Sequence, residues 1–253
     1  MAYELLIFEK RGPIATITLN RPDSLNALNN QLRVEIVQCI DECGDDEEVR
    51  VVVVKGAGRA FCAGDDLRSG GTTDPPSRRK GPTDVVLAIR HLRKPVIAAL
   101  QGFAFGAGME LAMACDFRIA AEGTQLAEPF VKRGIMYGGY LLPRYVGIGR
   151  ATEMLLTGEP ITVEEAESWG LVTRVVPADK LEATVEEWAQ RFATAATLAI
   201  GGLKEVINQG LGVGIEQGFQ YLAYESAKIA NSEDRIEGVR AFREKRQPVF
   251  KGR

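Results

Sequence analysis

Short apolar runs alternate with amphipathic stretches through the first half of the chain. Val51 to Lys55 and Val96 to Leu100 are continuous apolar runs of the kind that form buried strands. Two β-rich runs, Leu5 to Phe8 and Ile14 to Leu19, flank a Gly-Pro turn and predict an opening hairpin. Asn30 to Glu42 carries apolar residues at helical spacing. The pattern therefore predicts alternating strands and helices.

The second half of the chain is mainly helical. A helix from Ala107 to Ala114 and a strand from Phe117 to Ala120 continue the alternation, and helical periodicity dominates from Ala151 onward. The helices expected there are Thr162 to Ser168, Ala178 to Ala193, Leu198 to Asn208, Ile215 to Ala230 and Glu233 to Arg243. Arg68 to Pro82, rich in Gly, Pro and Ser, predicts a long loop. We therefore expect an α/β core over residues 1–195 and a helical region over residues 196–253.

Composition narrows the function classes. Lys and Arg number 31 against 34 Asp and Glu, which disfavours a generally basic nucleic-acid surface. The four cysteines lack CxxC spacing, and the first residues carry no signal-peptide pattern, so we expect a cytoplasmic protein. The apolar runs are too short to span a bilayer, which predicts no membrane anchor.

The sequence lacks the residues that several common catalytic and binding sites require. The single histidine, His91, sits at a predicted helix end beside charged residues, where we expect a solvated side chain rather than a triad or zinc site. No phosphate-binding GxxxxGK[ST] loop and no GxSxG elbow occur. The glycine turn after Val51 to Lys55 has Phe61 where a dinucleotide site needs its third glycine. We therefore predict no metal and no bound cofactor.

Two glycine-bearing turns remain, and each follows a predicted strand. They are Arg59 to Leu67, RAFCAGDDL, and Gly102 to Ala112, GFAFGAGMELA. Tight turns are the common use of glycine, but glycine also lets the backbone approach a ligand closely. Cys62 lies in the first turn without a base near it in sequence, so we expect a buried thiol rather than a nucleophile.

These turns resemble the signature motifs of the crotonase superfamily, the enoyl-CoA hydratase/isomerase family. The resemblance covers nearly the whole chain, from ITLNRPDSLNAL at Ile17 to Leu28, through KPVIAALQGFAFGAGMELAMACD ending at Asp116, to the C-terminal EGVRAFREKRQPVFKGR. It implies a crotonase-like ββα spiral core with a C-terminal helical trimerisation region. It also implies an acyl-CoA thioester as substrate, with coenzyme A arriving as part of that substrate.

The resemblance implies an oxyanion hole formed by the backbone N–H groups of Asp65 and Ala107. Ala107 would begin a helix, where N–H groups are unpaired and the helix dipole is positive. Glu110 falls one turn later on the same helix face, where the family places a catalytic glutamate. An acid in a first helical turn can also be a simple dipole partner. We predict that Glu110 is the general acid/base.

One position departs from the hydratase pattern. Hydratases carry a second glutamate after a proline, and the matching residue here is Phe130. Phe130 would add an apolar wall and raise the pKa of Glu110 by desolvation. Glu128, Tyr137 and the Asp65 side chain are the candidates for a substitute acid, and spacing does not choose among them. Double-bond migration therefore fits the residues at least as well as hydration.

The resemblance also implies how coenzyme A and neighbouring subunits bind. Asp23 stands where the family often has lysine, which weakens one expected phosphate contact. Phe242 and Lys245 match residues that reach the adenine pocket of a neighbouring subunit, which implies a homotrimer or hexamer, although a charged tail is also typical of a solvated surface. The residues expected to line the coenzyme A and substrate site are Ser24, Leu25, Arg59, Ala63, Asp65, Leu67, Arg68, Gly106, Phe130, Phe242 and Lys245.

Three function hypotheses follow. The first is an enoyl-CoA hydratase or isomerase that uses Glu110 and the N–H pair. The second is an acyl-CoA hydrolase or decarboxylase of the same superfamily. The third is a non-catalytic acyl-CoA-binding protein, with RNA affinity disfavoured by the acidic isoelectric point near 5.5.

Overall fold

The main sheet forms the centre of the protein in a computed structural model that describes residues 3–68 and 80–253. Its strand order is β1-β2-β3-β4-β6-β9. The hairpin of β1 and β2 is antiparallel, and every later pairing in this sheet is parallel. The strands are β1 (Leu6–Arg11), β2 (Ile14–Leu19), β3 (Val51–Gly56), β4 (Val96–Leu100), β6 (Phe117–Ala121) and β9 (Arg174–Val176).

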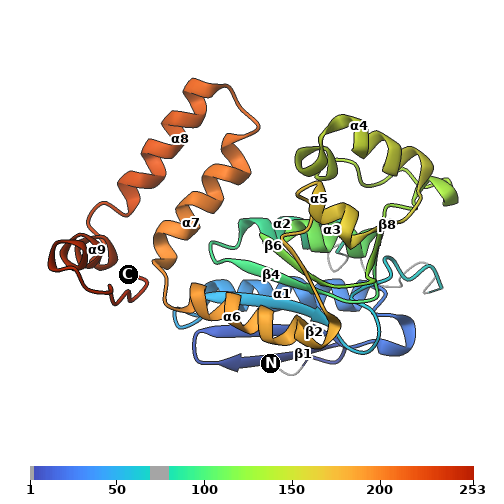
Figure 1. Cartoon of the computed structure of the whole chain (residues 1–253), viewed down its shortest axis with the longest axis horizontal. Helices are drawn as coiled ribbons and strands as arrows, with labels where there is room; N and C mark the ends of the chain where they lie inside the picture. Colours follow the sequence, from blue (N-terminus) through green and yellow to red (C-terminus); the bar gives the residue numbers. More distant parts are fainter. Residues whose placement is uncertain (1–2, 69–79) are drawn as a thin grey trace.

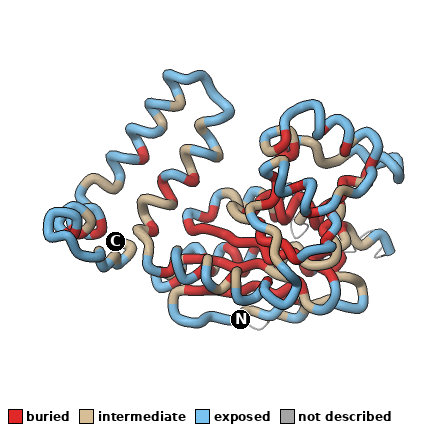
Figure 2. The backbone as a smooth tube through the Cα atoms, viewed as in Figure 1, coloured by how far each residue is buried: buried red, intermediate tan, exposed pale blue. Residues whose placement is uncertain are grey.

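Helices cover both faces of this sheet, which explains why its strands are apolar without alternation. Val52 and Val54 of β3 face a core shared with α1 (Asn30–Asp45), α2 (Pro82–His91) and α3 (Ala107–Ala114). Their neighbours Val51 and Val53 face the opposite side, where α6 (Leu181–Ala193) packs its apolar stripe of Leu181, Val185 and Ala189. Figure 2 shows the resulting buried centre of the molecule.

A smaller sheet places α3. It consists of β5 (Phe103–Phe105), β7 (Gln125–Ala127) and β8 (Ile161–Thr162), in the order β5-β7-β8. β5 runs directly into α3, so the pairing of β5 with β7 fixes where that helix begins. Two further helices, α4 (Leu142–Thr157) and α5 (Val163–Ser168), lie above this region in Figure 1.

The C-terminal helices extend away from the core (Figure 1). They are α7 (Thr197–Glu205), a π-helical turn (Val206–Gly210), α8 (Ile215–Lys228) and α9 (Glu233–Glu244). The Nζ atom of Lys204 on α7 donates to Asp116 Oδ2 at 2.8 Å and to the Lys94 carbonyl at 3.1 Å. Most of α8 is exposed in Figure 2, so this region has little core of its own.

The predicted α/β core followed by helices is confirmed, with shifts at element ends. The first strand is Leu6–Arg11, and residues 178–180 form a 3-10 turn before α6. α4 begins at Leu142, before the predicted helical boundary at Ala151, and Gly147 breaks it with φ 78°. The small sheet was not predicted, because its strands span only two or three residues. Most of the predicted loop from Arg68 to Pro82 lies outside the described residues.

Candidate functional site

The two glycine turns lie against each other. Cys62 N donates to the Phe103 carbonyl and Phe105 N donates to the Cys62 carbonyl, both at 3.0 Å, so the turns pair like two short strands. A Cβ on Gly108 would lie 2.3 Å from the Cys62 carbonyl oxygen, closer than any side chain allows. The glycine spacing read from the sequence is therefore required by the contact between the turns.

Two backbone N–H groups in these turns, those of Asp65 and Ala107, are placed to bind a ligand. Neither Asp65 N nor Ala107 N donates a hydrogen bond to another of the described residues. Gly64 brings the two close together, because a Cβ on it would lie 3.6 Å from Ala107 N and 2.7 Å from the Phe105 carbonyl oxygen. With φ +99°, Gly64 adopts a backbone conformation that suits glycine alone. An anionic oxygen could accept from both groups here.

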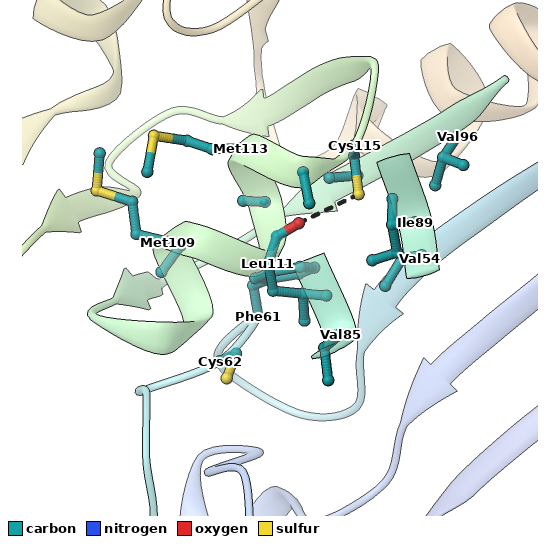
Figure 3. Packing of buried hydrophobic residues seen from close by; sticks show 14 of the residues in the cluster. Val54, Phe61, Cys62, Val85, Ile89, Val96, Met109, Leu111, Met113 and Cys115 are labelled. Atoms are coloured by element: carbon teal, nitrogen blue, oxygen red, sulfur yellow. Dashed lines mark hydrogen bonds between the residues drawn. The ribbon is translucent and has the colours of Figure 1, made fainter. Parts of the chain in front are cut away.

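Helix α3 holds Glu110 inside the protein. All of its residues are buried, and Figure 3 shows Leu111 on the side of Phe61 and Val85, with Met109 and Met113 on the other side. A helix packed on every side cannot shift easily, because buried side chains are close-packed. Glu110 N donates to the Gly106 carbonyl at 3.0 Å, which closes the first helical turn. Glu110 therefore occupies a fixed place one turn from Ala107.

The Glu110 carboxyl group is buried with one oxygen unpaired. It is 4 % exposed, and Oε1 has no hydrogen-bond partner among the described residues. Burial raises the pKa of Glu110 to about 7, against the opposing effect of a hydrogen bond from the Gly139 backbone. A carboxyl group with this pKa can both take and return a proton near neutral pH.

Phe130 places an aromatic ring between the start of α3 and Tyr137. Its ring lies over the start of α3, where a Cβ on Gly106 would be 3.4 Å from Cζ. It meets the Tyr137 ring edge-on, with centroids 5.4 Å apart. Because Phe130 is itself buried, it keeps water from this side of Glu110.

The three candidates for a substitute acid differ sharply. The Asp65 carboxylate is ion-paired with Arg33, so it is not a free acid. The Tyr137 hydroxyl lies 3.0 Å from Thr83 Oγ1, and burial raises the pKa of Tyr137 further above its ordinary value. Glu128 is fully buried next to Glu110, and its carboxyl oxygens have no hydrogen-bond partner in the part of the chain that the structure describes. Geometry therefore singles out Glu128, which spacing alone could not.

Some of the predicted coenzyme A residues are brought together. Ala63 N donates to the Leu25 carbonyl at 3.0 Å, which leaves only the Ala63 carbonyl for a ligand. Buried Asn26 ties the Ser24–Leu25 turn to the first glycine turn by donating to the Ala57 and Ala60 carbonyls at 2.8 Å. The remaining side chains predicted to flank this entrance are exposed, namely Arg59, Leu67 and Arg68.

Two predicted residues lie elsewhere. Phe242, 85 % exposed, and Lys245 belong to the end of α9, which lies away from α3 at the other side of the molecule (Figure 1). One chain therefore does not bring them to its own site. Cys62 is buried, and burial raises the pKa of its thiol to about 12, which agrees with an unreactive cysteine.

A cavity of about 450 Å³ opens beside Glu110. Its wall includes residues that the motifs did not single out, from α2, α4 and the π-helical turn. The guanidinium of Arg90 is held by Asn208, and Arg144 Nη2 donates to the Tyr140 hydroxyl at 2.9 Å. These wall residues are hard to predict from the sequence, because the segments that carry them have the pattern of ordinary surface helices. The lining residues are Thr83, Val86, Leu87, Arg90, His91, Glu110, Met136, Tyr137, Gly138, Tyr140, Leu141, Arg144, Asn208 and Gln209.

The described residues contain neither a candidate membrane span nor a candidate metal site. No helix there is both long and apolar enough to cross a membrane. No group of three or more His, Cys, Asp or Glu side chains there is placed to hold a metal ion.

Fold and glycine turns together define an α/β protein with paired backbone donors beside a buried acid. The chain matches the family described as Enoyl-CoA hydratase/isomerase over residues 9–253. It is 40% identical to the carnitinyl-CoA dehydratase of Citrobacter koseri and 39% identical to that of Salmonella typhi, each over 99% of both chains.

Solved structures of enoyl-CoA hydratases have the same fold as this chain. The enoyl-CoA hydratase of Bacillus anthracis has a TM-score of 0.92 at 35% identity, covering 99% of this chain and 100% of that one. That of Mycobacterium smegmatis has a TM-score of 0.89 at 32% identity, covering 98% and 99%. The chain belongs to the enoyl-CoA hydratase/isomerase family, the crotonase superfamily, as its motifs predicted.

Proposed function

We propose that the protein moves a proton between carbons of an acyl-CoA thioester through an enolate. Glu110 is the acid/base, and the N–H groups of Asp65 and Ala107 hold the enolate oxygen. The observation that carries this proposal is a buried carboxyl, with a pKa near 7, one helical turn from Ala107 N. Among the described residues, neither this N–H group nor that of nearby Asp65 has a hydrogen-bond partner. Coenzyme A is part of the substrate, and no cofactor takes part.

The surroundings of Glu110 favour double-bond migration over hydration. Migration needs one group that takes a proton from one carbon and returns it to another. Hydration needs water placed and activated beside the acid, and Phe130 fills the position where hydratases have their second glutamate. An apolar ring at that position excludes water, which suits a reaction in which no water is added to the substrate.

A panel of acyl-CoA thioesters followed by mass spectrometry tests the reaction type. Double-bond migration leaves the mass unchanged, water addition raises it, and hydrolysis or decarboxylation releases coenzyme A or CO₂. Carnitinyl-CoA belongs in the panel because two relatives of this chain are carnitinyl-CoA dehydratases. The guanidinium groups of Arg90 and Arg144 on the cavity wall disfavour its quaternary ammonium group. Binding without any product would support a non-catalytic acyl-CoA-binding protein.

The proposed base gives a definite pH dependence. Glu110 must be ionised to accept a proton, and its raised pKa of about 7 means that it ionises late. We therefore expect kcat/KM to rise with pH up to about 7 and level off above it, losing about tenfold per pH unit on the acid side. A profile of kcat/KM against pH measures this. A flat profile through neutral pH would contradict the assignment.

We further propose that the chain associates with itself through its C-terminal helices. Exposed apolar side chains repeat at helical spacing on α8, as Ile215, Phe219 and Leu222. α7 and the turn after it carry a second stripe, Leu203, Ile207 and Leu211. Exposed apolar patches of this kind mark protein–protein surfaces.

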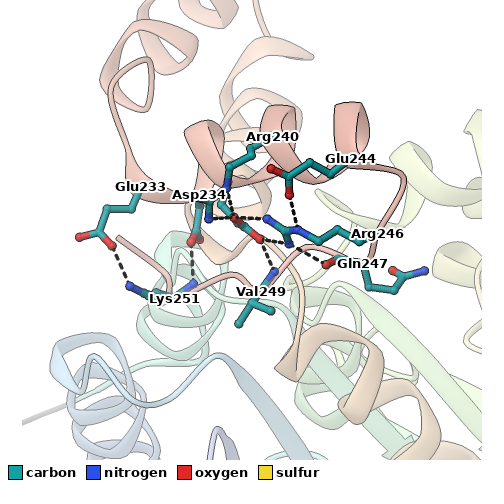
Figure 4. A network of polar contacts seen from close by, with 9 residues as sticks. Glu233, Asp234, Arg240, Glu244, Arg246, Gln247, Val249 and Lys251 are labelled. Carbon is teal, nitrogen blue, oxygen red and sulfur yellow. Dashed lines mark hydrogen bonds and ion pairs between the residues drawn. The ribbon is translucent and has the colours of Figure 1, made fainter.

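Hydrogen bonds and ion pairs join the last residues of the chain to α9. Glu237 accepts from Arg240, Arg246 and the Val249 backbone, and Asp234 accepts from the backbone of Lys251 (Figure 4). Asp234 also accepts from the backbone of Gly252. Basic residues around Glu237 lower its pKa well below its ordinary value. This network ties the tail to α9, the helix that presents Phe242. Helix α9 could offer Phe242 and Lys245 to a neighbouring subunit.

Light scattering after size exclusion tests the association. We expect the chain to run at three or six times its own mass and Phe219→Glu to shift it toward the monomer, because a charge would be buried in the apolar contact. Gln217→Glu, exposed on the other side of α8, adds the same charge and should leave the mass unchanged. A monomeric wild type would contradict the proposal.

A further inference from the structure

Glu128 is a buried acid that the proposed function leaves without a task. It directly follows β7, whose last carbonyl, that of Ala127, accepts from Gly106 N at 2.8 Å beside the start of α3. Glu128 is 0 % exposed, and both of its carboxyl oxygens lack a hydrogen-bond partner among the described residues. Burying an unpaired carboxylate is costly, so an acid at such a position holds a proton.

The Glu128 carboxyl faces Glu110 across Gly138. A Cβ on Gly138 would lie 3.1 Å from Glu128 Oε2, 3.2 Å from Glu110 Oε1 and 3.3 Å from Phe130 Cε2. The two oxygens lie near the same point, so the distance between Glu128 Oε2 and Glu110 Oε1 is at most about twice 3.2 Å. One side-chain rotation can close such a gap.

No basic side chain neutralises the pair. Neither Glu110 nor Glu128 forms an ion pair with a lysine, arginine or histidine in the described part of the chain. Tyr137 is the other titratable group whose charge the two acids affect. Burial and the nearby Glu110 raise the pKa of Glu128 well above its ordinary value, whereas that of Glu110 rises only to about 7. When their surroundings set the pKa values of two acids apart in this way, the acid with the lower pKa can act as the base. The acid with the higher pKa keeps its proton.

We propose that Glu128 is the proton-holding partner of Glu110 and exchanges protons with it during turnover. The inference rests on the proposed function. Glu110 takes a proton from C2 of a 3-enoyl thioester, and the C–H electron pair forms the dienolate, whose charge lies on the thioester oxygen. The pair of acids then holds two protons. One returns to C4 as the C2–C3 double bond forms and the carbonyl is restored.

Because Glu128 acts through Glu110, it is a positioning residue whose effect is on which proton is returned. With Glu110 alone, the proton taken from C2 goes back to C4. With two acids exchanging protons, the returned proton is drawn from both, so label carried by Glu128 enters the product. A residue with only a structural role would not change the origin of this proton.

The test is isomerisation of unlabelled 3-enoyl-CoA in D₂O by enzyme equilibrated in that solvent, with mass spectrometry of the 2-enoyl product. For the wild type we expect one deuterium at C4 in about half of the product molecules, because two protons are shared. Glu128→Gln keeps the size but holds no exchangeable acid proton, so its product should carry little deuterium. Exposed Glu122→Gln should match the wild type.

Gly138→Ala gives a second way to separate the pair if Glu128→Gln fails to fold. Its methyl group would stand between the two oxygens and should also lower the deuterium content. Equal deuterium in wild type and Glu128→Gln overturns the role of Glu128 while leaving the proposed function intact. A wild type that isomerises no 3-enoyl-CoA overturns both.

Discussion

Glu110→Gln is expected to lower kcat by about 10²- to 10⁴-fold, the range that general acid/base groups contribute. Glutamine keeps the size of the side chain and its contact with the Gly139 backbone but cannot accept a proton from carbon. The change is expected to leave the fold intact, because it removes a buried charge rather than a packing contact. Steady-state kinetics on the best thioester from the panel measure the effect.

Binding separates this loss from a damaged site. Calorimetric titration with coenzyme A should give the wild-type affinity for Glu110→Gln, because Glu110 lies on the acyl side of the site. Glu122→Gln, the same change at an exposed position, should keep full activity. If Glu110→Gln turned over its substrate at the wild-type rate, another residue would have to be the base.

Gly64→Ala is expected to lower kcat by about 10²- to 10³-fold, the typical effect of losing one oxyanion donor. The added methyl would lie 2.7 Å from the Phe105 carbonyl oxygen and 3.6 Å from Ala107 N. The turn must then move, and the Asp65 and Ala107 N–H groups would no longer point at one oxygen. Because these donors act on the charged intermediate, kcat should fall more than KM rises.

Gly123→Ala is the matched control for this change. Gly123 also has a positive φ, +77°, but a Cβ there meets nothing within 4 Å. Both variants therefore carry backbone strain, and only Gly64→Ala disturbs the N–H pair. Thermal unfolding of both measures the strain. Similar losses of activity in the two variants would show that strain, rather than the N–H pair, accounts for the effect.

Much of the fold could be predicted because the hydrophobic pattern is strong. Val51 to Lys55 and Val96 to Leu100 read as buried strands, and both are central strands of the main sheet. Asn30 is correctly placed as the first residue of a helix, capped by Asn29, which accepts from Leu32 N. Strands of two or three residues, such as β8, carry too few positions for any period to be visible.

The candidate site also has one part that can be predicted from the sequence and one part that cannot. Glycine turns have a sequence signature because only glycine allows the contact, as at Gly108 against Cys62. The pairing of Glu128 with Glu110 has none, since it depends on where β7 ends relative to α3. A signal did exist: Glu128 interrupts an apolar run after a buried strand, where an acid is out of place. The cavity wall was missed because it combines three distant segments.

Exchange of the C2 hydrogens of saturated acyl-CoA thioesters in D₂O isolates the formation of the enolate, because it requires no later step. Mass spectrometry follows the gain of deuterium with time. We expect exchange by the wild type and by Gly123→Ala, and strongly slowed exchange by Glu110→Gln and Gly64→Ala. Exchange by Glu110→Gln at the wild-type rate, or no exchange by the wild type on any thioester, would contradict the proposed function.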